Sequence, residues 1–217
     1  MLIYAAAQGG SQERELFARR YGGPVRAYLA QRWRGSAFIS LLDDAVQEVF
    51  AECFRENGPL VRADRSCGGF RAYLYGAVRN IARAMERRHL GQRDRPASAW
   101  NFNEVVADED SLSQVFDQAW ARTMVREAAV RQQELAAHAG EAAMRRVELL
   151  HLRFYENLPI RDIAKLWEIS AVQLHRDYAK AREEFRTALC EVLRDHDPDP
   201  TVAIEERVES LLAAFGK

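Results

Sequence analysis

Apolar residues recur at helical spacing in almost every patterned segment of this chain, and that periodicity restricts its fold more than any other feature. Phe70, Leu74, Val78, Ile81 and Met85, for example, follow one another at intervals of three or four residues. Such spacing places the side chains on one face of a helix, where they form a buried stripe. No pair of alternating segments is joined by a tight turn, which is the pattern of a β-hairpin. The sequence therefore predicts an all-α fold.

Turn signals divide the chain into two small helical domains joined by a flexible linker. In the first domain, residues 1–90, we expect helices at residues 12–20, 24–33, 43–56 and 70–90. The string Gly22-Gly23-Pro24 separates the first two, because proline is tolerated in the first turn of a helix but interrupts its interior. In the second domain, residues 112–194, we expect helices at residues 112–139, 141–155, 159–167 and 171–194.

The linker and the C-terminal tail are acidic. Residues 91–111 are polar, contain a proline and show no clear period, so we expect them to form the linker. Residues 195–217 form an acidic tail, and the prolines of its DHDPDP string prevent the preceding helix from continuing. A short amphipathic helix at residues 202–215 is expected to pack on one of the domains or to bind a regulator.

Composition argues against several classes of protein. Apolar residues make up 48% of the 217-residue chain, so it is not disordered as a whole. Cys53, Cys67 and Cys190 form no CxxC pair or His/Cys cluster, which argues against a metal site and a disulfide framework. No apolar run approaches the roughly 20 residues of a membrane span, and no catalytic motif stands out. We expect a cytoplasmic protein without enzymatic activity, cofactor, metal ion or membrane span.

Charge is distributed unevenly, although the formal net charge is only -1. Steps of four along the helix expected at residues 70–90 give a basic row: Arg71, Tyr75, Arg79, Arg83 and Arg87. Like charges at this spacing repel by roughly 0.2–0.5 kcal/mol per pair. The row therefore indicates a polyanionic ligand that would neutralise it. Arginine contacts phosphates, and the rings of Tyr73 and Tyr75 offer faces on which unpaired bases stack. The alternative is a solvated face that binds nothing.

The helix expected at residues 43–56 has the opposite character. Asp44, Glu48 and Glu52 lie four residues apart on one face, with Gln47 beside them. We call these residues, together with Asp43, the acidic row. A basic protein partner explains the row, whereas nucleic acid does not. A face that serves solubility alone is the alternative.

A third pattern lies near the C-terminus. A short helix at residues 159–167, a brief turn and a longer helix predict a helix-turn-helix, in which Ser170 caps the second helix. The second helix exposes a polar row: Gln173, His175, Arg176 and Lys180. Glutamine and arginine suit adenine and guanine edges, and lysine suits phosphate. The turn has Glu168 where glycine is usual, and an ordinary helical hairpin is the alternative.

Together these motifs resemble the extracytoplasmic-function group of the sigma-70 superfamily, over about residues 12–194. The stretch DDAVQEVFAECF (Asp43–Phe54) is similar to the acidic polymerase-docking helix of that family. The stretch FRAYLYGAVRNIARAMERR (Phe70–Arg88) is similar to its promoter-melting helix. Residues 149–182 are similar to sigma domain 4, which reads the –35 element. The resemblance implies that residues 1–90 are sigma domain 2 and that the chain is an alternative sigma factor.

The resemblance also implies partners and roles. Core RNA polymerase is the expected partner, through its β′ clamp and its β flap, with promoter DNA and an anti-sigma factor or other regulator. The polymerase-binding residues would be Asp43, Asp44, Gln47, Glu48 and Glu52. The –10 residues would be Arg71, Tyr73, Tyr75, Arg79, Asn80, Arg83 and Arg87, with a flipped base held by the loop at residues 57–69. The –35 residues would be Gln173, His175, Arg176 and Lys180, and the linker would follow the RNA exit path.

Two rival functions fit part of the pattern. One is a conventional helix-turn-helix regulator that never contacts polymerase, and the other is a helical adaptor that binds another protein. The acidic row discriminates between them and a sigma factor, because a repressor has no use for it. The sigma interpretation also requires that the carboxylates of the acidic row and the guanidiniums of the basic row do not neutralise each other.

Overall fold

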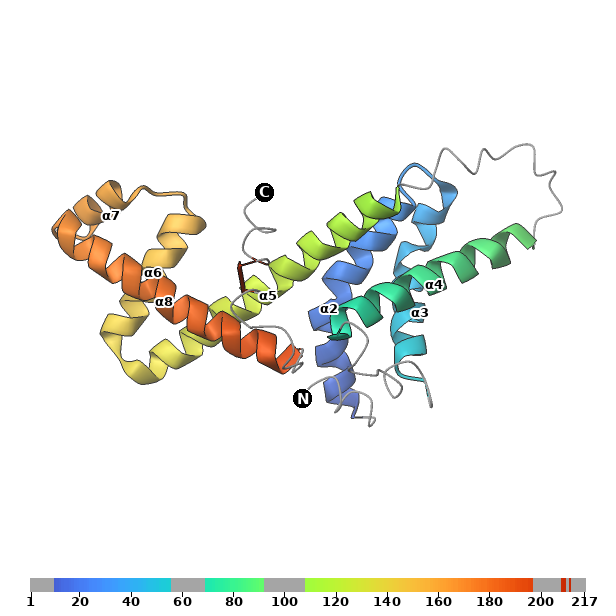
Figure 1. The fold of residues 1–217 in the computed structure, drawn as a ribbon, viewed down its shortest axis with the longest axis horizontal. Coiled ribbons are helices and arrows are strands. Elements are labelled where there is room, and N and C mark those ends of the chain that lie inside the picture. The colour runs from blue at the N-terminus through green and yellow to red at the C-terminus, as the bar shows by residue number, and fades with distance from the viewer. Residues whose placement is uncertain (1–9, 56–68, 92–107, 197–207, 210, 212–217) are drawn as a thin grey trace. The chain divides into compact units, whose positions relative to one another are not determined.

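The computed structural model describes residues 10–55, 69–91, 108–196, 208–209 and 211. These residues form seven α-helices and one 3-10 helix, and no strand occurs among them (Figure 1). The all-α prediction is therefore confirmed for this part of the chain. None of the described helices is long and apolar enough to cross a membrane.

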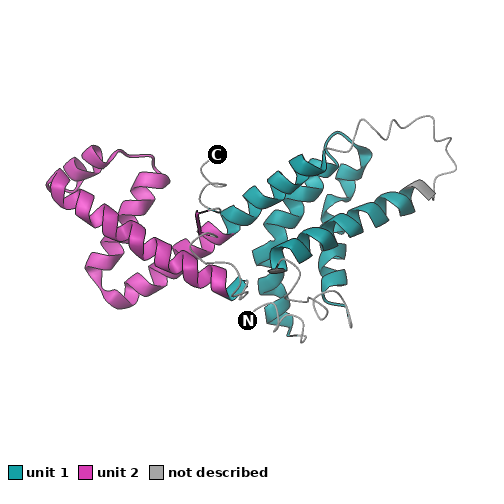
Figure 2. Cartoon of the chain, viewed as in Figure 1, with its two compact units in different colours: residues 1–123, 195–202, 210–217 teal, residues 124–194, 203–209 magenta. Residues whose placement is uncertain are grey.

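The chain divides into two compact units, coloured separately in Figure 2. Unit 1 comprises residues 1–123, 195–202 and 210–217, and unit 2 comprises residues 124–194 and 203–209. The division falls inside a helix, α5 (Glu109–Ala139), and not before Leu112, where the sequence analysis places the domain boundary. Leu112 and Phe116 are fully buried, which explains why the first part of α5 belongs to unit 1.

Unit 1 is built from four α-helices and a 3-10 helix around an aromatic core. Its elements are α2 (Ser11–Arg32), η1 (Ala37–Leu41), α3 (Leu42–Cys53), α4 (Gly69–Gly91) and the first part of α5. Phe17 contacts the rings of Tyr21 and Phe70 at centroid distances of 4.6 and 5.7 Å. The ring of Tyr21 stacks on Trp120 at 5.4 Å, and its hydroxyl bonds to Nδ1 of the buried His196 at 2.7 Å.

The expected break at Gly22-Gly23-Pro24 is wrong, because α2 runs through it without interruption. Pro24 lies inside the helix and is buried, as are its neighbours Tyr21 and Val25. Proline costs about 3 kcal/mol in a helix interior. Burial of a large apolar side chain contributes about 1.5–3 kcal/mol, so the two fully buried neighbours are enough to offset that cost. Tertiary packing has overridden local propensity here.

Unit 2 contains the rest of α5 with α6 (Glu141–Phe154), α7 (Ile160–Leu166) and α8 (Ala171–His196). Gly140 joins α5 to α6 with φ of 98°, a conformation that glycine adopts at little cost. The core is made by Leu149, Ile163, Ala164 and Leu174. A buried side-chain bond, from Gln132 Nε2 to the Ala181 carbonyl at 3.1 Å, ties α5 to α8 within this unit.

The expected helices otherwise differ from the observed ones mainly at their ends. The helix α3 begins at Leu42 and ends at Cys53, after a 3-10 turn that the sequence analysis missed. The helix α5 begins at Glu109, so residues 109–111 are helical although they were assigned to the linker. The rest of the expected linker, apart from Gly91 and Asp108, lies outside the described residues, as do residues 57–68 of the expected loop and most of the tail.

Candidate nucleic-acid interface

The helix α4 buries the stripe that its sequence predicts. Leu74 and Val78 are fully buried, and Ile81 and Met85 are nearly so. The basic row therefore lies on another face, where its side chains are half-buried except that of Arg87, which is exposed. Asn80 is exposed as well. The helix thus combines an apolar face with a charged face that other groups can reach.

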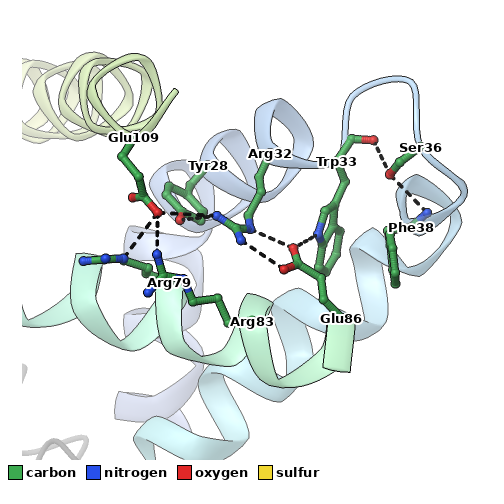
Figure 3. A network of polar contacts seen from close by, with 9 residues as sticks. All are labelled: Tyr28, Arg32, Trp33, Ser36, Phe38, Arg79, Arg83, Glu86 and Glu109. Atoms are coloured by element: carbon green, nitrogen blue, oxygen red, sulfur yellow. Dashed lines mark hydrogen bonds and ion pairs between the residues drawn. The ribbon is translucent and has the colours of Figure 1, made fainter. Parts of the chain in front are cut away.

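Four polar side chains of unit 1 converge on the carboxylate of Glu109, at the first residue of α5. Figure 3 shows the three arginines among them, Arg32, Arg79 and Arg83. Arg83 Nη2 donates to Glu109 Oε1 at 2.8 Å, and the Tyr75 hydroxyl donates to Oε2 at 3.3 Å. Arg79 Nε and Arg32 Nη1 lie 3.4 and 3.7 Å from Oε1. We call these residues the Glu109 cluster. Arg79 Nε is buried and has no hydrogen-bond partner among the described residues, so Glu109 leaves one donor of the cluster unsatisfied.

The guanidinium of Arg32 is held in place from its other side. Its Nε and Nη2 donate to the two oxygens of Glu86 at 2.7 and 3.0 Å, and Trp33 Nε1 donates to the same carboxylate at 2.8 Å (Figure 3). Arg32 is only 4% exposed. Burial lowers the pKa of the Arg32 guanidinium, but hydrogen bonding to Glu86 and the charges of Glu86 and Tyr28 outweigh burial and raise it overall. Arg32 is thus a fixed cation beside Glu109.

The two tyrosines of the expected –10 surface are packed against protein. The Tyr75 ring meets Tyr28 and Phe116 edge-on, at centroid distances of 5.5 and 5.4 Å. Burial and the neighbouring Glu109 carboxylate raise the pKa of Tyr75 above its usual value. The Tyr73 hydroxyl is buried without a hydrogen-bond partner among the described residues. Burial, with smaller contributions from Cys53 and Glu52, raises the Tyr73 pKa.

Both charged rows contain members that form ion pairs within unit 1. Arg71 pairs with Asp117 of α5, and Arg79 and Arg83 pair with Glu109.

In the acidic row, Asp43 pairs with Arg26 of α2, with Arg26 Nη1 at 2.6 Å from Oδ1. The other pairs are Glu48 with Arg88 of α4 and Glu52 with Arg55. Asp44, Gln47 and Arg87 are exposed, and no ion pair joins Asp44 or Arg87 to the described residues.

Most charged members of both rows therefore have a partner of opposite charge within unit 1. Among the described residues, the two rows nevertheless do not neutralise each other: Glu48 alone of the acidic row pairs with α4, and its partner Arg88 is not part of the basic row. The side chains of the Glu48–Arg88 pair are 38% and 56% exposed. Exposed ion pairs of this kind contribute only about 0–1 kcal/mol to stability. An external cation can therefore replace Arg88 as the partner of Glu48 at low cost.

In unit 2, the four residues of the expected –35 surface all lie on the exposed side of α8. Gln173, His175, Arg176 and Lys180 are exposed, while Leu174 between them is fully buried. The predicted cap is present, since the Gln173 amide donates to Ser170 Oγ at 3.2 Å. Glu168 in the preceding turn has φ of 53°, the left-handed conformation that glycine usually supplies. The side chain of Gln173 also donates to Asp177 Oδ1 at 3.1 Å.

The sequence analysis missed Arg32 and the role of Glu109. A signal for the first was present, because Glu86 is the only acid in residues 70–90 and follows Ala82 at helical spacing on the buried side. A buried carboxylate needs a cation or several donors, but nothing in the sequence says that Arg32 supplies them. Glu109 was grouped with the linker acids, since the helix start at Glu109 carries no strong signal.

No group of three or more metal-binding side chains occurs in the part of the chain that the structure describes. Comparison of the sequence with protein-family models and with curated proteins finds no match. The functional argument therefore depends on the residues themselves and on the geometry described above.

Proposed function

We propose that this chain is an alternative sigma factor of the extracytoplasmic-function type, which docks on core RNA polymerase through α3 and binds an opened promoter strand through α4. The single observation that carries the proposal is that α3 and α4 pack together in unit 1 yet direct opposite charges outward. A protein that bound only duplex DNA would have no use for the exposed acids of α3. A protein that bound only another protein would have no use for the arginines of α4.

The polar side of α8 supports the same proposal from the other unit. Gln173, His175, Arg176 and Lys180 provide donors and acceptors of the types that read base edges and contact phosphates. Asp177 lies among them, but its carboxylate already accepts a hydrogen bond from the Gln173 side chain, which partly compensates its negative charge. We propose that this side contacts the –35 duplex and that the turn at residues 167–170 acts as the turn of a helix-turn-helix.

Core polymerase binding tests the proposal directly. The double variant Asp44→Lys/Glu48→Lys is expected to lose co-purification with core polymerase, because two carboxylates that meet a basic surface become cations. The matched control is Glu15→Lys/Asp110→Lys, which makes the same charge change at two other exposed residues of unit 1. Circular dichroism checks that both double variants remain helical. Retained binding by Asp44→Lys/Glu48→Lys refutes the docking role of α3.

A transcription assay separates a sigma factor from a conventional regulator. Purified chain and core polymerase, given a pool of genomic promoter fragments, are expected to yield run-off transcripts with discrete starts. Arg79→Ala with Arg83→Ala is expected to reduce strand opening more than binding to a duplex –35 site. Equal losses in the two assays would show that the two DNA surfaces are assigned wrongly.

A further inference from the structure

The Glu109 cluster has the chemistry of an anion site whose occupant belongs to the same chain. Among the described residues, three guanidiniums, those of Arg32, Arg79 and Arg83, face two carboxylates, those of Glu86 and Glu109. The cluster therefore keeps a surplus positive charge even with Glu109 in place. Within the part of unit 1 that the structure describes, the buried Nε of Arg79 still lacks a hydrogen-bond acceptor. These features fit an anionic ligand that places one oxygen within hydrogen-bonding reach of Arg79 Nε as well as one near Arg83.

We propose that the Glu109 cluster binds a backbone phosphate of a single DNA strand and that the Glu109 carboxylate holds the site until the strand displaces it. A phosphodiester carries one negative charge, as a glutamate does. Its two non-bridging oxygens can accept from Arg83, Tyr75 and the unsatisfied Nε of Arg79. Naming nucleic acid as the ligand rests on the proposed function.

Displacement requires only a small movement. The Glu109 side chain is 39% exposed, and it belongs to the first turn of α5, so a change of rotamer carries the carboxylate into solvent. Arg79 and Arg83 are each 40% exposed and remain accessible to a strand. The rest of α5 stays in place, because Leu112 and Phe116 are fully buried in unit 1. Arg32 also stays in place, since Glu86 binds its other side.

The two ends of the site have different roles in this proposal. Arg32 is buried and supplies a fixed charge, with its Nη1 3.7 Å from the Glu109 oxygen that the phosphate would replace. Arg79 and Arg83 move with the strand and supply the hydrogen bonds. The internal carboxylate lowers the affinity for stray polyanions, because every strand must replace an existing partner before it gains a new one.

The test measures binding of a fluorescent 12-nucleotide thymidine strand to the full chain by anisotropy. Glu109→Gln keeps the size of the side chain and removes its charge, and we expect it to bind the strand about fivefold more tightly. Asp110→Asn is the matched control, because Asp110 lies one residue away, is exposed and has no ion pair within the described residues. Its affinity should change by less than about twofold. An equal gain in both variants overturns the proposal, because it would reflect net charge alone.

Salt dependence and competition complete the test. Arg83→Gln is expected to weaken strand binding and to lower the slope of log affinity against log salt by about 0.7, the value for one phosphate of a single strand. Arg122→Gln, an exposed change elsewhere on α5, should leave the slope unchanged apart from scatter. If millimolar inorganic phosphate displaces the strand and Glu109→Gln tightens phosphate rather than strand binding, the site is for a small anion and the proposal is overturned. Polymerase is absent from this assay, so its result is independent of the docking test.

Discussion

The buried pair between Arg32 and Glu86 is the feature whose removal should cost unit 1 most, and Glu86→Gln tests it. The carboxylate accepts three hydrogen bonds from two buried groups, at 2.7, 2.8 and 3.0 Å. Glutamine keeps one acceptor oxygen but turns an amide N–H₂ toward Arg32, and it leaves a cation that is 4% exposed without a counter-charge. Hydrogen bonds to charged groups contribute about 1.5–3 kcal/mol, and unpairing a buried ion costs about 3–5 kcal/mol. We expect a loss of about 3 kcal/mol.

Hydrogen–deuterium exchange of α4 peptides measures this loss in unit 1 alone, because the amides of α4 exchange only when that unit opens. Glu48→Gln is the matched control: it removes a carboxylate from a half-exposed pair, and the free energy of opening should fall by less than about 1 kcal/mol. The double variant Arg32→Met/Glu86→Leu should recover most of the loss, because it removes both charges together. Equal losses for Glu86→Gln and Glu48→Gln would refute the buried ion pair.

Two further predictions concern single residues. Burial, with a smaller contribution from Glu52, raises the pKa of the Cys53 thiol to about 12, so its thiolate fraction stays near one in ten thousand at pH 8 and rises only toward pH 12. In a variant with Cys67 replaced by serine, a maleimide at pH 8 should modify the half-buried Cys190 and spare Cys53. Equal modification of the two cysteines, measured by mass spectrometry, would contradict this prediction. Glu168→Gly should stabilise unit 2 by about 0.5–1 kcal/mol, because glycine adopts φ of 53° without strain. A lower urea midpoint than that of the parent chain would show that the Glu168 side chain contributes more to stability than its backbone strain costs.

Sequence periodicity predicted most of the helices because each buries one apolar stripe, and α4 shows this directly. It failed at Pro24, where the buried neighbours Tyr21 and Val25 hold the helix together despite a local break signal. It also failed at the start of α5, because a first turn that carries Glu109 and Asp110 looks the same as an acidic linker. Both failures have one origin: the deciding contacts are made by residues far away in the sequence.

The candidate site shows the same limit more sharply. The residue types and spacing of the basic row were sufficient to predict which face of α4 carries its arginines, since only the geometry of one helix is needed. The sequence could not predict that the Glu109 carboxylate pairs with this face, because Arg32, Arg83 and Glu109 come from α2, α4 and α5 and meet only in the folded unit (Figure 3).

The energetics of the two kinds of pair explain how a charged face can be both ordered and available. The Arg32–Glu86 pair is buried, so replacing one partner by solvent costs several kcal/mol and the pair stays formed. The pairs of Arg83 with Glu109 and of Arg71 with Asp117 are about 40% exposed, so water and salt already weaken them. In the proposed site, an incoming phosphate would therefore meet one fixed cation, Arg32, and arginines whose present ion pairs are weak. Unpaired arginines on one helix face would repel one another, whereas these arginines keep their geometry through their internal ion pairs in the absence of a ligand.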